Sequence, residues 1–249
     1  MKLPEAIKSL SKREAISIAQ THATKLGIEW RSGINCIFNA CLNNPDLLPT
    51  NIGTKKDSAH EVVEKWVQKY KDGYTNRISA HRSNMPSTIA DPIIEVIIQG
   101  RLTYLDEESL GKIKYAHRLC MSAENILGLL LEEYLAVHLA PQGWFCAWGE
   151  TIRSVDFSSS KGDLLQIKNR SNSENSSSSR VREGTDISKW YRIDAISGKF
   201  LWDDLNAKLG VFCSEGAFRD FVRDALSHNP EALAIEPENP WLTELKGKS

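Results

Sequence analysis

The spacing of apolar positions predicts helices over most of the first half of the chain. Ser11 and Glu14 have the spacing of a capping box, and the apolar repeat that follows them runs to about Leu26. The same criteria predict four further helices, over residues 35–42, from Asp57 or Ser58 to Gly73, from Asp91-Pro92 to Ile98, and over 107–120. Polar, turn-rich residues predict a long loop over 76–88.

The second half of the chain changes to a mixed pattern. Residues 123–138 predict a helix with few solvent-facing positions, which implies burial against other layers. Short aromatic or alternating runs predict strands over 144–148, 151–157 and 164–168. A turn containing a glycine separates the last two runs, so we expect a hairpin over 151–168. A further short strand is expected over 211–213. The fold class is therefore expected to be α/β.

Composition and length exclude several classes of protein. The chain has 249 residues with 41% hydrophobic and 25% charged residues, which is ordinary for a globular protein of one large or two modest domains. Its richest apolar run, Ile126–Leu131, is too short for a membrane span. The first residues lack an apolar segment and include Glu5, so we expect no signal peptide and a cytoplasmic location.

The cysteine pattern and the absence of well-known short motifs exclude several kinds of functional site. Five scattered cysteines without a Cys-x-x-Cys pair are typical of reduced thiols, and they indicate neither a zinc site nor a disulfide framework. Phosphate-binding loops, dinucleotide-binding fingerprints and nucleophile elbows are absent. His60 and Glu61 begin a zinc-protease pattern, but Glu64 stands where the second histidine is required.

Charge is distributed unevenly although the net charge is −1. Residues 161–192 hold seven Lys/Arg against four Asp/Glu, whereas residues 193–249 hold six against ten. A basic segment in a neutral chain is compatible with a local phosphate-binding surface and with a solvated loop.

One set of polar residues in the hairpin could support catalysis. Gln166 and Lys168 share a strand face, because side-chain direction repeats every two residues, and the hairpin can bring Asp156 beside them. Carboxylate and amide oxygens are ligands for Mg2+, and a lysine can help to deprotonate a water or stabilise charge on a phosphate. The same three residue types also occur on solvated strand faces, so the spacing leaves both interpretations open.

The predicted helix just upstream offers a further acid. On a helical wheel Glu133 falls among Ile126, Leu130 and Val137, where a charged group needs a partner or a metal. Glu132 lies on the more polar side. We therefore expect Asp156, Gln166 and Glu133 to hold the metal, with the choice between Glu133 and Glu132 left open.

The order of these residues resembles the PD-(D/E)XK nuclease core. Asp156 is followed ten residues later by Gln166-x-Lys168, and Asp163 is a competing candidate for the acidic position. Two departures from the family pattern are a valine at position 155 in place of proline and a glutamine at position 166 in place of an acid. The resemblance implies that Asp156, Gln166 and Lys168 are catalytic and that Mg2+ is the cofactor.

A second resemblance is more specific. The run from Gln166 to Trp190 is similar to type II restriction endonucleases of the SinI type, and the likeness extends over about residues 121–205. It implies Mg2+-dependent cleavage of double-stranded DNA at a GGWCC-like site. It also implies a nuclease core over 121–249, with a small mixed sheet flanked by helices. The helical pattern of the preceding residues predicts a helical N-terminal region over 1–120.

Residues 169–192 are interpreted as the DNA-recognition segment. Serine, asparagine, arginine and lysine bind phosphates and base edges, and a carboxylate can accept from cytosine. Trp190 is expected to pack beneath this segment. The expected DNA contacts are Asn169, Arg170, Asn172, Ser173, Glu174, Asn175, Arg180, Arg182, Lys189 and Arg192.

Two functional classes remain. The first is a sequence-specific endonuclease, and the alternative is a non-catalytic DNA-binding protein with a degenerate nuclease fold. Retention of Lys168 beside Asp156 favours the first class. Because a GGWCC-like site is nearly palindromic, we expect a homodimer on DNA, with the helical N-terminal region as the source of its contact surface.

Overall fold

The structure is a computed structural model that describes residues 1–31, 33–87, 89, 91–171 and 185–242. These residues divide into two compact units that interleave along the chain. The first unit comprises Met1–Arg77 and Leu131–Phe221, and the second comprises Ile78–Leu130 with the residues after Phe221. The boundary expected between residues 120 and 121 lies inside a long helix, α6 (Glu107–Leu139).

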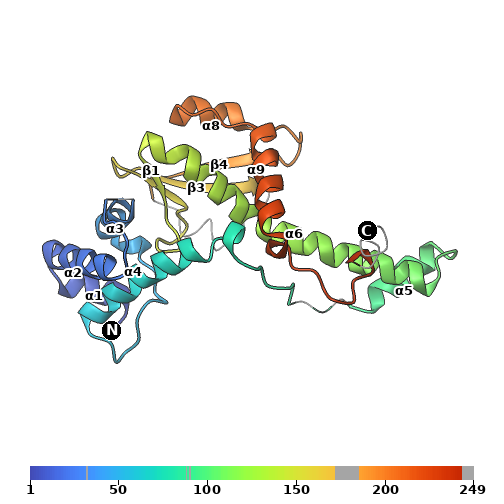
Figure 1. Cartoon of the computed structure of the whole chain (residues 1–249), viewed down its shortest axis with the longest axis horizontal. Coiled ribbons are helices and arrows are strands. Elements are labelled where there is room, and N and C mark those ends of the chain that lie inside the picture. Colours follow the sequence, from blue (N-terminus) through green and yellow to red (C-terminus); the bar gives the residue numbers. More distant parts are fainter. Residues whose placement is uncertain (32, 88, 90, 172–184, 243–249) are drawn as a thin grey trace. The chain divides into compact units, whose positions relative to one another are not determined.

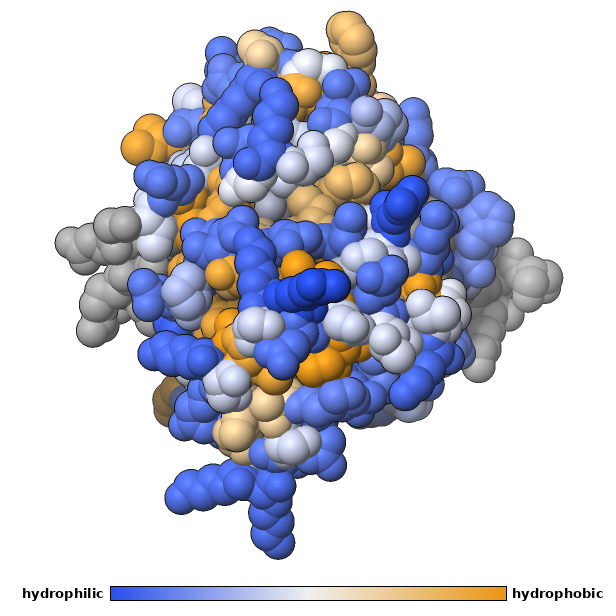
Figure 2. Space-filling view, turned by 90° about the vertical axis from the view of Figure 1, so that its left-hand side faces the viewer, coloured by the Kyte–Doolittle hydropathy of each residue, from blue (hydrophilic) through white to orange (hydrophobic). Residues whose placement is uncertain are grey.

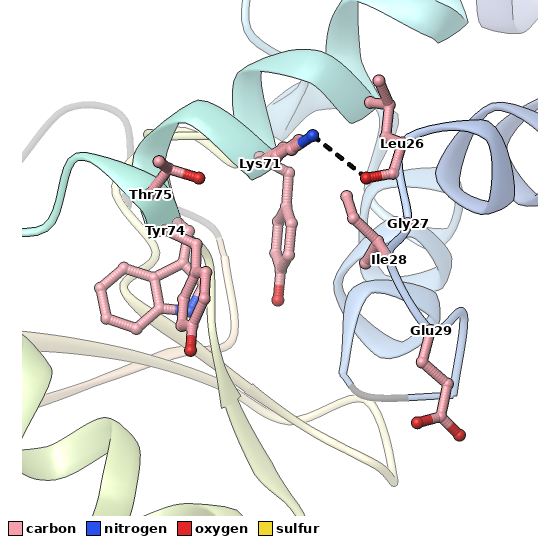
Figure 3. A pocket seen from close by; sticks show the side chains of 9 residues that line it. Leu26, Gly27, Ile28, Glu29, Lys71, Tyr74 and Thr75 are labelled. Carbon is pink, nitrogen blue, oxygen red and sulfur yellow. Dashed lines mark hydrogen bonds between the residues drawn. The ribbon is translucent and has the colours of Figure 1, made fainter.

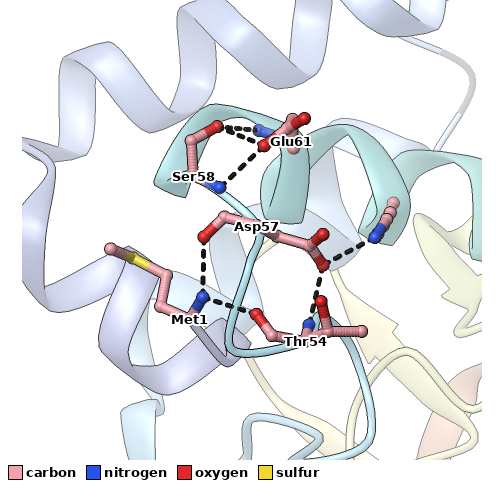
Figure 4. Close-up of polar contacts among 6 residues, drawn as sticks. Met1, Thr54, Asp57, Ser58 and Glu61 are labelled. Carbon is pink, nitrogen blue, oxygen red and sulfur yellow. Dashed lines mark hydrogen bonds and ion pairs between the residues drawn. The ribbon is translucent and has the colours of Figure 1, made fainter.

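Four helices form the start of the first unit, and the sequence predicts three of them closely. They are α1 (Leu3–Ser9), α2 (Lys12–Lys25), α3 (Ile34–Asn43) and α4 (Ala59–Thr75). Ser11 caps α2 and Ser58 caps α4, each in a reciprocal capping box with the glutamate three residues later. Figure 4 shows the second box, in which Glu61 accepts from the backbone N–H of Ser58 at 2.7 Å.

The apolar faces of these helices meet in one core. The Trp66 ring lies between Phe38 and Tyr70, with ring centroids 4.8 and 6.0 Å away. None of the large hydrophobic side chains exposed in the described structure comes from residues 1–73. Figure 2 shows the face at the left of Figure 1, where hydrophilic residues predominate and smaller apolar areas show between them.

A four-stranded mixed sheet completes the first unit and confirms the α/β class (Figure 1). The strand order is β1-β2-β3-β4; β1–β2 and β2–β3 are antiparallel, whereas β3–β4 is parallel. Helix α3 packs against β1 and β2. The strands are β1 (Trp144–Cys146), β2 (Phe157–Ser159), β3 (Leu164–Arg170) and β4 (Ile187–Ile193).

The predicted hairpin forms, but its first strand is shorter and begins later than expected. Residues 151–156 are not strand, and β2 begins at Phe157. Glu150 and Ser154 both adopt positive φ angles, of 54° and 59°, and such conformations turn the chain away from an extended path. The alternation seen in the sequence therefore belongs to a folded loop over residues 147–156.

Two further expectations about elements were wrong. The helices expected over 107–120 and 123–138 are one helix, α6, because neither proline nor glycine interrupts the chain between them. Residues 211–213 are not a strand. The Asn206 side chain takes both backbone groups of Cys213, accepting from its N–H and donating to its carbonyl, each at 2.8 Å.

The first unit also contains α8 (Trp202–Leu209) and the first turns of α9 (Glu215–His228). Tyr134, near the end of α6, contacts the rings of Trp202 and Phe218. Trp190 of β4 joins this aromatic cluster, is buried, and donates to the Leu201 carbonyl at 2.8 Å. Trp190 is thus buried as expected, but most of the segment predicted to cover it lies outside the described residues.

The second unit is built on the first two thirds of α6 and on α5 (Ile93–Arg101). Segments that follow α9 pack within this unit: Arg118 forms an ion pair with Glu236, and Asn229 donates to the His81 carbonyl at 3.0 Å. Four short 3₁₀ helices complete the described elements of the chain, at Pro45–Leu47, Ile78–Ala80, Ala140–Gln142 and Pro230–Ala232. No helix in the described ranges combines the length and apolar character of a membrane span.

Candidate nuclease site

Asp156 lies immediately before β2 and extends its pairing. Its backbone N–H donates to the Leu165 carbonyl at 3.0 Å, and its carbonyl accepts from the Ala147 N–H at 2.8 Å. Its carboxylate Oδ2 accepts from the backbone N–H of Ile167 at 2.7 Å. The structure thus brings the Asp156 carboxylate to the stretch of β3 between Gln166 and Lys168.

Gln166 is buried, and one of its polar atoms has no hydrogen-bond partner among the described residues. Only 3% of its surface is exposed, and its Oε1 has no hydrogen-bond partner in the described part of the chain. A buried amide oxygen without a partner is unfavourable, unless a ligand or an ordered water satisfies it. The alternation of β3 places the half-buried Lys168 on the same strand face as Gln166.

Helix α6 carries two adjacent acids, Glu132 and Glu133, and their surroundings differ. Burial raises the pKa of Glu132 well above its usual value, and the negative charges of Asp156 and Glu150 raise it further, while the Lys168 charge lowers it. Glu133, which the wheel placed on the core face, is buried, and its Oε2 lies 3.9 Å from Arg77 Nε. Of the two adjacent acids, Glu132 is thus the one whose pKa responds to the charges of Asp156 and Lys168, whereas Glu133 lies near Arg77.

The helical wheel misjudged this face of α6. Val137, which the wheel grouped with Glu133, is 66% exposed. Tyr134 instead faces the aromatic cluster, and its neighbour Glu133 is directed to Arg77. A buried face that includes a carboxylate cannot be found from apolar spacing alone, because the partner of that carboxylate comes from another element.

Asp163, the competing acidic candidate, stabilises the turn between β2 and β3. Its Oδ2 accepts from Ser159 Oγ at 2.7 Å, and its backbone N–H donates to the same hydroxyl at 3.0 Å. These contacts are those of a residue that holds a tight turn. The carboxylate that accepts from the Ile167 N–H is that of Asp156, not that of Asp163.

Glu150 is a residue that sequence reasoning missed. It has a positive φ, follows Gly149 in the loop between β1 and β2, and contributes to the raised pKa of Glu132. A non-glycine residue in this conformation is uncommon, and such residues concentrate at functional sites. The only signal in the sequence is an acidic residue directly after a glycine between two short strands.

The donor set of this site fits a hard divalent cation. Carboxylate oxygens of Asp156 and Glu132 and the amide oxygen of Gln166 are oxygen ligands, which Mg2+ prefers. No group of three His, Cys, Asp or Glu side chains that could hold a metal ion occurs within the described ranges. Any such site therefore depends on the amide oxygen of Gln166 or on water in addition to the two acids.

The expected DNA contacts fall into two groups. Asn169, Arg170, Lys189 and Arg192 are described, whereas Asn172, Ser173, Glu174, Asn175, Arg180 and Arg182 lie outside the described residues. Arg170 and Lys189 are exposed, on neighbouring strands β3 and β4.

Arg192 is placed differently from a residue that contacts phosphate. It is buried; its Nη1 lies 2.6 Å from Glu215 Oε2, and its Nε donates to Asn169 Oδ1 at 2.8 Å. Its guanidinium also lies over the rings of Phe200 and Phe218. The structure thus uses Arg192 and Asn169 to fix β3, β4 and α9 together, because a buried arginine requires such partners.

A pocket in the first unit is separate from these residues (Figure 3). Its volume is about 410 Å³, and Lys71 Nζ donates to the Leu26 carbonyl at 3.1 Å across it. Its wall contains none of the residues that the sequence assigns to catalysis or to DNA contact. The lining residues are Leu26, Gly27, Ile28, Glu29, Tyr70, Lys71, Tyr74, Thr75 and Trp148.

Comparison with known proteins defines the class to which this arrangement belongs. A sequence model of the SinI restriction endonuclease family matches residues 18–228, which is most of the chain. The chain therefore belongs to the SinI restriction endonuclease family.

Two curated relatives share this likeness. The type II restriction enzyme Eco47I of Escherichia coli is 39% identical over 147 residues, which cover 57% of this chain and 64% of that protein. The type II restriction enzyme SinI of Salmonella infantis is 39% identical over 150 residues, with the same shares. The matched region thus spans less than two thirds of the length of either relative.

Proposed function

We propose that this protein is a type II restriction endonuclease that cleaves double-stranded DNA at a GGWCC-like site with Mg2+ as cofactor. The observation that carries the proposal is the contact of the Asp156 carboxylate with the Ile167 N–H, between Gln166 and Lys168. Membership of the family and the names of the two relatives support the same reaction. The sequence preference follows the resemblance of residues 166–190.

Each residue of the site has a separate role in this proposal. Asp156, Gln166 and Glu132 would hold the cation, which supplies a Lewis acid next to the scissile phosphate when it is bound. The Ile167 N–H binds one oxygen of the Asp156 carboxylate. This hydrogen bond to the backbone restricts rotation of the side chain and so fixes the direction of the second oxygen. Lys168 lowers the pKa of Glu132, and its ammonium would orient the attacking water or stabilise charge on the phosphate.

We assign DNA binding to residues 170–191, which include the exposed Arg170 and Lys189. We leave Asn169 and Arg192 out of the contact surface because they bind each other and Glu215. Arg180→Ala and Arg182→Ala are each expected to weaken binding to a cognate duplex. We further propose a two-fold symmetric dimer on DNA, since one chain carries one such site for one strand, and a cytoplasmic location.

A comparison of two adjacent glutamates tests this assignment. Plasmid DNA with mapped sites is incubated with the parent protein, with and without Mg2+, and with Glu132→Gln and Glu133→Gln. Cleavage by the parent should require the cation, Glu132→Gln should lower its rate by about 10²-fold or more, and Glu133→Gln should lower it less. Equal losses would remove Glu132 from the site. Specific binding without any cleavage would support the alternative of a non-catalytic DNA-binding protein.

A further inference from the structure

Helix α5 presents an apolar stripe that none of the described residues of its own unit covers. It has no buried residue, although most of its side chains are isoleucine or valine. Ile93, Val96 and Ile97 are 54%, 60% and 66% exposed, and Gly100 has open space where a side chain would stand. These four positions have the spacing i, i+3, i+4 and i+7, so they form one face of the helix.

The opposite face of α5 is attached to the rest of the second unit. Glu95 Oε1 lies 3.4 Å from Lys114 Nζ on α6, and Gln99 Nε2 donates to the Leu105 carbonyl. Because Glu95 faces α6, the stripe of Ile93, Val96 and Ile97 faces away from it. The orientation of α5 in its own unit is therefore fixed by polar contacts, which leave the apolar side outward.

We propose that α5 is the contact helix of a homodimer, packed antiparallel on the α5 of a second copy of this chain. A two-fold axis between positions 96 and 97 would set Ile93 against Gly100 of the partner subunit and Val96 against Ile97 of the partner subunit. The large side chain of Ile93 then packs on a glycine, and Val96 packs on a side chain of similar size. A two-fold interface requires such self-complementarity. This inference names the surface of the dimer in the proposed function.

Charge and further exposed apolar residues agree with this occupant. The same axis brings the exposed Arg101, in the last turn of α5, to the exposed Asp91 at the start of the partner's helix. The same unit also exposes Ile89, Ile94, Tyr104 and Ile113. A standard stable interface takes about 800 Å² from each partner, so a dimer through α5 would use exposed apolar residues of this kind as well as the stripe.

A charge placed in the stripe tests the dimer without DNA or metal. Sedimentation of the full chain is measured over about 0.1–100 µM for the parent, for Ile97→Glu and for Val137→Glu. Val137 is the matched control, because it is equally exposed on a helix but lies outside the stripe. We expect the parent and Val137→Glu to dimerise alike, and Ile97→Glu to dissociate with a Kd roughly 100-fold higher or more while its circular dichroism is unchanged.

Cross-linking tests the antiparallel register. Ile93→Cys/Gly100→Cys, made with Cys120→Ser to remove an exposed thiol, should form a covalent dimer under mild oxidation. Either single cysteine should not, because two copies of the same position lie too far apart for a disulfide. A monomeric parent, or dimerisation unaffected by Ile97→Glu, would overturn the proposal and indicate that DNA or the first unit of the same chain covers the stripe. Neither result bears on cleavage, which is measured separately.

Discussion

Helix α4 and the candidate nuclease site belong to the same compact unit but satisfy their buried groups in opposite ways. α4 buries Val62, Val63 and Trp66 against apolar neighbours, and its N-terminus is fully capped by Ser58. In the site, Gln166 Oε1 has no partner within the described chain, and Glu132 is held close to two other carboxylates. Complete satisfaction is typical of a region that stabilises a fold, whereas unsatisfied polar groups are typical of a region that awaits a ligand.

The largest expected effect is on catalysis and leaves the fold intact. Lys168→Ala should lower plasmid cleavage by about 10³-fold or more, because it removes the ammonium group that the site offers to the phosphate or water. Binding to a cognate duplex and the thermal midpoint should stay near those of the parent. Lys161→Ala, in the exposed turn between β2 and β3, is the control. Full activity of the Lys168 variant would remove the contrast between the two regions.

Truncation of a core side chain of α4 should instead lower the stability of the fold. Trp66→Ala removes a fully buried ring and its hydrogen bond from Nε1 to the Thr151 carbonyl. The free energy of unfolding should fall by about 3–5 kcal/mol, measured by urea denaturation. Trp66→Phe keeps most of the apolar contact and isolates the hydrogen bond, so it should cost less, about 1–3 kcal/mol. An unchanged midpoint for Trp66→Ala would contradict the assigned core.

Removing the charge of Glu132 should stabilise the metal-free protein. The folded-state pKa of Glu132 is raised, so its stabilising contribution is complete below the unfolded pKa and is lost as pH rises through the folded pKa. Glu132→Gln removes that loss, and the variant should therefore unfold at a higher temperature than the parent at neutral pH but not at acidic pH. Calorimetry with a chelator present measures the difference. A lower midpoint at neutral pH would show that the carboxylate stabilises the metal-free fold.

The smallest effect is expected at the cap of α4. Ser58→Ala removes the acceptor for the Glu61 N–H and should lower the free energy of unfolding by about 1 kcal/mol, with no effect on cleavage. Ser58→Asp keeps an acceptor at the same position and should retain most of the stability. Denaturant midpoints of the three proteins would show whether the cap matters.

The sequence predicted the helices whose ends carry their own signals. Ser11 and Ser58 cap helices that begin where expected, since a capping box is a local interaction. The placement of Asp156 beside Gln166 and Lys168 was also predictable, because hairpin pairing and strand alternation determine it. The different surroundings of Glu150, Glu132 and Glu133 were not, since they depend on how α6 and the loop at 147–156 approach the sheet.

The structural role of a glycine was also not predictable from the sequence. Gly73 was expected to end a helix, but α4 continues through it to Thr75. A side chain at Gly73 would overlap the backbone of Gly149, so the glycine is there to permit close approach. The printed sequence offers no means to distinguish a glycine that ends a helix from one that allows another segment to touch it.

That close approach makes the geometry of the candidate site depend on a distant glycine. Gly149 begins the turn that carries Glu150 and leads to Asp156, and the backbone of α4 at Gly73 is the surface on which this turn rests. The position of the Asp156 carboxylate is thus set partly by a residue 83 positions earlier in the chain. A single methyl group added at Gly73 would push this turn away from α4, and we expect it to shift the Asp156 carboxylate relative to the Ile167 N–H.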